Sequence, residues 1–206
     1  QSNEPRKTRL VLSAPHSVAE TWLAEKLAPL TKTETYTPID IRIDDDPVDF
    51  VQDKIDMRIF FGHDLYGDYG VTRLFSGMLI AVASPSLIDR FGKRIENIPD
   101  EYLIHTDWGR GFASMPNWEA AIPENHQIDR DLGMHVRMSS TALKFARNGF
   151  GVALIPAEMG ASDLSAGLVQ EMEVSPMELL QSYSIACPKR LQSNPTILAV
   201  LDNLTR

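Results

Sequence analysis

Short apolar strands alternate with amphipathic stretches along this chain, and that order restricts the possible folds more than any other feature. The first apolar run stops before Pro15, a residue that cannot continue a central strand. Ser17 and Glu20 then form an S-x-x-E capping box ahead of apolar residues at helical spacing. The predicted elements are strands over 9–14, 39–43 and 56–61 and a helix over 18–30. Parallel neighbours need such crossovers, so the pattern predicts a doubly wound α/β sheet.

A second α/β series follows a Gly-rich turn near Gly67 and Gly70 and an apolar strand that ends at Ser84-Pro85. The apolar strand, predicted over 78–83, ends the first series, and the second series comprises strands predicted over 103–105, 134–137, 152–155 and 168–171 and a helix over 140–148. A strand over 182–186 and a helix over 195–204 are predicted to return to the first lobe. Gly149 suits the left-handed position after the first of these helices. We therefore predict two lobes joined by two crossovers, with 9–84 plus 184–206 in the first lobe and 85–183 in the second.

Charge and composition restrict the partners of these 206 residues. Twenty Lys and Arg against 28 Asp and Glu give 20 − 28 = −8, and such an acidic surface repels a nucleic-acid backbone. The lone Cys187 cannot form an internal disulfide, which favours a reducing compartment, and the sequence carries no apolar segment long enough for a membrane span. These observations favour a cytoplasmic protein without a membrane partner.

Several fragments together resemble the effector-binding domain of LysR-type transcriptional regulators. They are LVLSAPHSVAETWLAEKLAPL, DMRIFFG, RLFSGMLIAVASPSLI and HVRMSSTALKFARNGFGVALIP, followed by GLVQ, and they extend over most of 9–206. The resemblance implies a two-lobed fold of the type 2 periplasmic-binding-protein class, with an effector cleft between the lobes. It also implies a homodimer or homotetramer, formed by antiparallel pairing of these domains.

Two further features depend on this resemblance. Trp108 and Trp118, which follow LIHTD, are similar to the branch of the family that includes the glycine-cleavage activator. The family's winged helix-turn-helix and linker helix, which normally come first, are expected to be absent from this chain, so DNA would be bound only through that missing part. Trp22 and Leu143 are expected to point outward, on helices that form the pairing surface.

Ligands of open α/β sheets bind beyond the carboxyl ends of the strands, and several predicted strand ends should meet there. Helix N-termini favour anions, which predicts a small anionic effector such as a carboxylate. The candidate effector-binding residues are Pro15, His16, Ser17, Val18, Phe61, Gly62, His105, Thr106, Met138, Ser139 and Ser140. The serines have an ordinary alternative role as helix caps, worth about 1 kcal/mol each.

Other conspicuous residues favour structural roles. The histidines lack a compact ligand spacing, so no metal site is predicted. Phe61, Trp108 and Trp118 are typical of core or cleft wall. The run Asp44-Asp45-Asp46 lacks the pattern of a calcium loop and is interpreted as a solvated turn.

Three classes of function remain open at this point. A sensor domain would couple effector binding to a change in oligomer geometry. A periplasmic-type solute-binding receptor would share the fold but would need a secretion signal. An enzyme would need Ser17 with His16, or Cys187, as an activated nucleophile, and the sequence carries no G-x-S-x-G elbow or phosphate loop. We predict the sensor, with no catalytic residue and no cofactor.

Overall fold

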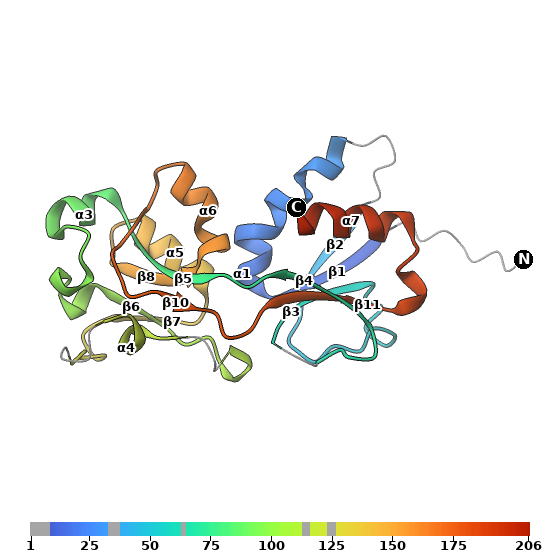
Figure 1. The fold of residues 1–206 in the computed structure, drawn as a ribbon, viewed down its shortest axis with the longest axis horizontal. Helices are drawn as coiled ribbons and strands as arrows, with labels where there is room; N and C mark the ends of the chain where they lie inside the picture. The colour runs from blue at the N-terminus through green and yellow to red at the C-terminus, as the bar shows by residue number, and fades with distance from the viewer. Residues whose placement is uncertain (1–8, 33–37, 63–64, 113–115, 123–126) are drawn as a thin grey trace, which may run out of the picture.

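The computed structural model describes residues 9–32, 38–62, 65–112, 116–122 and 127–206. Two groups of strands and helices lie side by side, each built on its own sheet (Figure 1). This arrangement confirms the predicted α/β fold of two lobes.

The first sheet has five strands in the order β2-β1-β3-β11-β4. Their bounds are β1 (Leu10–Ala14), β2 (Ile39–Ile43), β3 (Met57–Phe61), β4 (Gly70–Phe75) and β11 (Tyr183–Cys187). The pairs β1–β2 and β1–β3 are parallel, as predicted, whereas β11 is antiparallel to both β3 and β4. The returning strand enters from the second lobe and therefore runs against its neighbours.

The second sheet has six strands, with β9 paired to β5 beside the order β10-β5-β8-β6-β7. Their bounds are β5 (Met78–Ala83), β6 (Leu103–Thr106), β7 (Met134–Val136), β8 (Val152–Pro156), β9 (Gln170–Glu171) and β10 (Met177–Glu178). Strands β6, β7 and β8 are parallel, while β5 is antiparallel to β8. Each sheet thus has three neighbouring parallel strands, β2-β1-β3 and β8-β6-β7, whose carboxyl ends lie at one edge of that sheet.

The chain crosses between the sheets between β4 and β5 and again between β10 and β11. Two crossovers were predicted, but the boundary after residue 84 would have assigned β5 to the first lobe. The pairing of β5 with β8 instead gives that strand to the second sheet. A strand that is buried on both faces carries no periodic signal that tells which sheet it joins.

Helices cover the sheets and connect their strands. The α-helices are α1 (His16–Val18), α2 (Ala24–Leu27), α3 (Pro85–Phe91), α4 (Trp118–Ala121), α5 (Ser139–Arg147), α6 (Ala157–Ser165) and α7 (Pro195–Thr205). The other helical segments are η1 (Ala19–Leu23), a π-helix, and the 3₁₀ turns η2 (Ala28–Lys32), η3 (Ile95–Asn97), η4 (Asp100–Tyr102), η5 (Arg110–Phe112) and η6 (Lys189–Leu191).

The predicted helix over 18–30 is one helical run from α1 to η2, but it begins two residues earlier than expected. Pro15 occupies the N-cap position and offers no side-chain hydrogen bond. Ser17 lies inside the first turn, and the Glu20 carboxylate approaches His16 Nδ1 at 3.2 Å. The predicted capping box is therefore wrong, because both of its side chains have other partners.

The predictions for α5 and α7 are closer to the structure. Gly149 has φ +82°, and the amide of Phe150 donates to the Phe145 carbonyl, so α5 ends in the expected left-handed cap. Asn194 caps α7 by accepting from the amides of Thr196 and Ile197. Strong local end signals therefore located both helices to within one residue.

The sequence patterns did not predict α3, α4, α6, β4 or β10. Ser84 accepts a hydrogen bond from the Leu87 amide and Pro85 occupies the first turn of α3, a helix start that was interpreted only as the end of a strand. Strand β4 begins at Gly70, where glycine suggested only a turn. For α3, then, the signal was present in the sequence.

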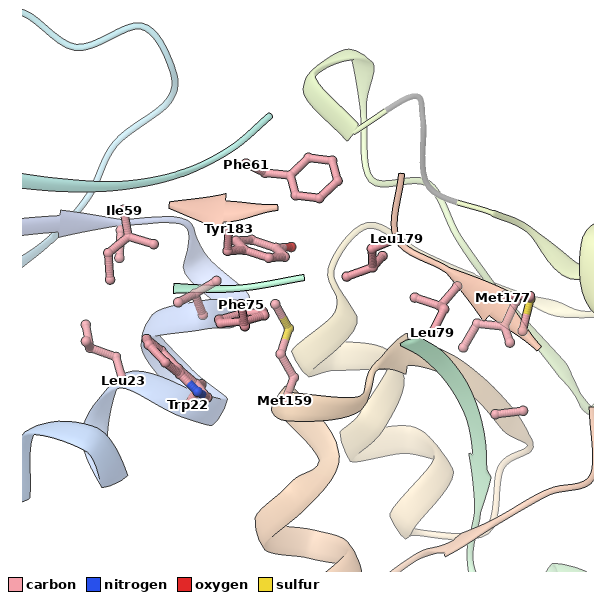
Figure 2. Close-up of a cluster of buried hydrophobic side chains, with 14 of the residues drawn as sticks. Trp22, Leu23, Ile59, Phe61, Phe75, Leu79, Met159, Met177, Leu179 and Tyr183 are labelled. Carbon is pink, nitrogen blue, oxygen red and sulfur yellow. The ribbon is translucent and has the colours of Figure 1, made fainter. Parts of the chain in front are cut away.

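One cluster of buried hydrophobic side chains contains residues of both sheets and therefore joins the two lobes (Figure 2). The ring of Trp22 lies 4.9 Å from that of Phe75, which in turn lies 4.7 Å from Tyr183. Met159 of α6 and Leu79 of β5 continue the same cluster into the second lobe. The expectation that Trp22 and Leu143 point outward is wrong, since both are only 6% exposed.

Candidate ligand-binding cleft

A cleft of about 690 Å³ opens where the carboxyl ends of the parallel strands of both sheets face each other. The first lobe contributes the segments that follow β1, β2 and β3, and the second lobe those that follow β6 and β7. The volume is in the range of small-molecule sites, which are commonly formed at such strand ends. The topology therefore positions this cleft between the lobes.

Eight of the eleven candidate residues line this cleft. They are Pro15, His16, Ser17, Val18, Phe61, Gly62, Met138 and Ser139. Residues from three distant parts of the chain thus meet where the strand-end argument expected them. Contact of each with an effector stays a prediction.

The structure does not place Ser140, His105 or Thr106 in the cleft lining. Ser140 faces Ser17, with its amide 3.2 Å from the Ser17 hydroxyl oxygen. His105 stacks on His135 at 4.9 Å between ring centroids, and burial, with the nearby His135 and Arg130, lowers its pKa. Strand β6 continues to Thr106, so the chain reaches the cleft only afterwards, at Trp108. His105 and Thr106 were assigned to the cleft because the sequence predicted that this strand ends at His105.

A buried arginine lines the cleft on the side of the first lobe. Arg58 is 1% exposed, and its guanidinium donates to both carboxylate oxygens of Asp46, at 3.0 and 2.9 Å. A third bond, of 2.8 Å, goes to the Ser13 hydroxyl, which itself donates to Asp44 at 2.7 Å. This bidentate pair holds the wall in one geometry.

The interpretation of Asp44-Asp45-Asp46 as a solvated turn is wrong for its first and last members. Burial alone would raise the pKa of Asp44, but hydrogen bonds from Ser13 and Arg42 outweigh it and lower the pKa. Asp46 also accepts from the Tyr66 hydroxyl, and burial together with this bond raises the pKa of Tyr66 to about 12. Asp45 is exposed at the rim and, among the described residues, has no ion pair or side-chain hydrogen bond.

The second-lobe wall is held by neutral groups. The indole of Trp108 donates to the Ser139 hydroxyl at 2.7 Å, so the first residue of α5 is fixed from the side. Arg137 and Arg110 line the same wall with exposed side chains. Trp118, in contrast, is 2% exposed and donates to the Ile104 carbonyl inside the core.

Aromatic rings form the apolar part of the cleft. Phe61 of β3 stacks on Phe112 of η5, with ring centroids 5.1 Å apart, and Tyr183 lies 4.9 Å from Phe61. All three rings line the cleft, and they come from both lobes. Phe61 was predicted as wall, whereas the other two were missed because no local pattern connects them.

A pair of serines links the lobes at the edge of this cleft. The Ser17 hydroxyl accepts from the Ser140 amide at 3.2 Å, and the two hydroxyls lie 3.4 Å apart. Met138, at the N-cap of α5, offers no side-chain bond, so Ser17 supplies a cap from the other lobe. The helix ends that were predicted to bind the effector are thus also a contact between the lobes.

With this geometry established, similarity to known proteins identifies the family. Residues 3–206 match the family model described as the LysR substrate binding domain. The chain belongs to this family. LysR substrate-binding domains are parts of transcriptional regulators and not of enzymes, in agreement with the predicted absence of catalysis.

Among curated proteins, the glycine cleavage system transcriptional activator of Escherichia coli K12 is 30% identical over 166 residues. The match covers 78% of this chain and 52% of the activator, and the same values hold for the protein of Escherichia coli O157:H7. The chain therefore spans about half the length of the curated relatives it matches.

Solved structures of the LysR family share the fold at low identity. The AmpR effector domain of Pseudomonas aeruginosa has a TM-score of 0.70 at 19% identity, covering 95% of this chain and 93% of that one. The CrgA regulatory domain of Neisseria meningitidis has a TM-score of 0.71 at 12% identity, covering 96% and 97%. The full-length Vibrio cholerae virulence activator AphB has a TM-score of 0.64 at 12% identity, covering 96% and 67%.

The structure of this LysR substrate-binding domain also bears on metal binding, on the reactivity of its thiol and on membrane spans. Among the described residues, no three His, Cys, Asp or Glu side chains come together as a metal site. Burial raises the pKa of the Cys187 thiol, so the group is a poor nucleophile where it lies. None of the described helices is long and apolar enough to cross a membrane.

Proposed function

We propose that this chain is the effector-sensing domain of a LysR-type transcriptional regulator, with a small carboxylate-bearing effector bound in the cleft between its lobes. The observation that carries the proposal is that residues from both lobes line one cleft in a domain of this family. A ligand that contacts both walls stabilises one relation of the lobes over others.

The contact between Ser17 and Ser140 offers a route for this coupling. It joins the first turn of the first-lobe helix to the first turn of α5 across the edge of the cleft. An anion at the start of α5 would interact with the same turn that Ser17 caps. Effector binding would therefore change the strength of the contact between the lobes.

The whole protein would act through parts beyond this domain. The match covers only 52% of its curated relatives, which are transcriptional activators, and this supports a DNA-binding segment elsewhere in the full-length protein. Such a regulator would work in the cytoplasm as a homodimer or homotetramer, and effector binding would alter the spacing of its DNA-binding parts. The alternative, a periplasmic-type solute-binding receptor, would instead need an export signal and a membrane partner.

Thermal denaturation and calorimetry of the purified chain with acetate, succinate, benzoate and 3-phenylpropanoate test the proposal. We expect at least one of these carboxylates to bind saturably and to raise Tm, because a ligand that binds only the folded state stabilises it. Ser139→Ala should weaken that binding while leaving the fold intact.

The matched control is Ser165→Ala on α6, an exposed serine whose hydroxyl bonds only to carbonyls of its own helix. Equal affinities of the two variants would remove Ser139 from the site. A complete lack of saturable carboxylate binding would contradict the proposal of a carboxylate-bearing effector.

A further inference from the structure

The two rims of the cleft carry opposite charges. Asp45 lies on the first-lobe rim, while Arg110 and Arg137 lie on the second-lobe wall. In the part of the chain that the structure describes, none of these three side chains has an ion pair or a side-chain hydrogen bond. All three are exposed and available to a ligand.

The other acidic groups of the cleft are already engaged. Both oxygens of Asp46 are bonded to Arg58, and the oxygens of Asp44 accept from Ser13 and Arg42. A cationic ligand group would have to break these bonds to reach either carboxylate. Asp45 is therefore the acceptor that remains for a ligand donor.

The hydroxyl of Tyr183 is a further donor for a ligand in the cleft. Tyr183 is 2% exposed and lines the cleft, and its hydroxyl has no hydrogen-bond partner among the described residues. Figure 2 shows this hydroxyl pointing away from β11 toward Leu179 and the second lobe. Burial, with the nearby Glu158 carboxylate, raises the pKa of Tyr183, and the hydroxyl keeps its proton at neutral pH. A ligand carboxylate in the cleft could accept a hydrogen bond from this hydroxyl.

We propose that the effector is a zwitterionic amino acid, an inference that rests on the proposed function. Its ammonium group binds Asp45, and its carboxylate binds Arg137 and the Tyr183 hydroxyl, all of which line the cleft. Its side chain packs on the stacked rings of Phe61 and Phe112. Such a ligand carries both charges near neutral pH and so matches both rims at once.

Ligands with one charge match only half of this arrangement. A simple carboxylate leaves Asp45 without a partner, and a simple amine leaves Arg137 and the Tyr183 hydroxyl without one. A hydrogen bond to a charged group is worth about 1.5–3 kcal/mol, which corresponds to a change in Kd of about tenfold or more. Ligands of the same shape that differ in one charged group should therefore separate clearly.

Isothermal titration of the purified chain with matched ligands tests the inference. One set is L-phenylalanine, 3-phenylpropanoate and 2-phenylethylamine, and a second is L-leucine, 4-methylpentanoate and 3-methylbutylamine. The remaining common amino acids are screened by thermal shift. We expect an amino acid to bind at least about tenfold more tightly than either single-charge relative of its shape.

Variants assign the two charges. Asp45→Asn should weaken amino-acid binding about tenfold and leave binding of the matched carboxylate unchanged, whereas Arg137→Gln should weaken both. Tyr183→Phe removes only a hydroxyl and should also weaken both ligands. Asp89→Asn and Arg190→Gln change exposed charges away from the cleft and serve as controls that keep wild-type affinity.

The outcomes separate this inference from the proposed function. If a matched carboxylate binds as tightly as the amino acid, or if no amino acid binds, the zwitterion assignment is overturned. Carboxylate binding in the cleft would still support a carboxylate-bearing effector. Equal losses of carboxylate affinity in Asp45→Asn and Arg137→Gln would overturn the assignment of the ammonium group.

Discussion

Arg58 and Arg137 face the same cleft from opposite lobes, but their surroundings differ. Arg58 is 1% exposed and is bonded to Asp46 and Ser13, whereas Arg137 is exposed and has no partner among the described residues. The first-lobe wall is therefore held rigidly before any ligand arrives. The second-lobe wall keeps its charges free and can adjust to a ligand, which divides the site into a fixed half and an adaptable half.

The largest effect should come from removing the buried charge of the fixed half. Arg58→Met would leave Asp46 without its ion-pair partner and should lower the free energy of unfolding by about 3 kcal/mol. Arg137→Met should change it by less than about 0.5 kcal/mol, because that side chain is exposed and unpaired. Urea denaturation of both variants measures the difference, and similar losses would refute the contrast between the walls.

A second comparison sets the core of the second lobe against its cleft wall. Trp118→Phe removes a buried donor and leaves the Ile104 carbonyl without it, so we expect a loss of about 2 kcal/mol. Trp108→Phe removes the hydrogen bond to the Ser139 hydroxyl in the second-lobe wall, and we expect the free energy of unfolding to fall by about 1 kcal/mol or less. Chemical denaturation followed by circular dichroism measures both, and a larger loss at Trp108 would show that this wall is rigid too.

The contact between the two halves should make a smaller contribution. Ser17→Ala removes the oxygen that accepts from the Ser140 amide, and the loss of a capping bond costs about 1 kcal/mol. Hydrogen exchange of that amide should become faster, while exchange in the centre of the first sheet should not. Unchanged protection of the Ser140 amide would mean that this bond does not couple the lobes.

The smallest expected effect concerns pH and the second lobe alone. Burial, with the nearby His135 and Arg130, lowers the pKa of His105, so the unfolded chain binds this proton more readily than the folded one. Stability from this group is present above pH 6.5 and is lost as pH falls below it. His105→Phe should reduce the decrease in unfolding free energy between pH 7.5 and 5.5, at about 25 °C. An equal pH dependence in both proteins would contradict this assignment.

The sequence alone determined much of the fold. Apolar runs, helix spacing and the end signal at Gly149 predicted most strands, the helices over 140–148 and 195–204 and the division into two lobes. The rule that strand ends meet predicted eight residues of the cleft lining from three separate segments. The predictions of strands and helices succeeded because each depends on residues that are close together in the chain, whereas the prediction of the cleft lining used the topology of a parallel α/β sheet.

The partners that these local elements select were decided by tertiary structure. The bond of Arg58 to Ser13 joins residues 45 positions apart, and that of Ser140 to Ser17 joins residues 123 apart. The direction of β11, the sheet that receives β5 and the burial of Tyr183 likewise follow from packing. A local pattern specifies which side chains are apolar or charged, but their neighbours, and so their burial and pairing, exist only once distant segments have come together.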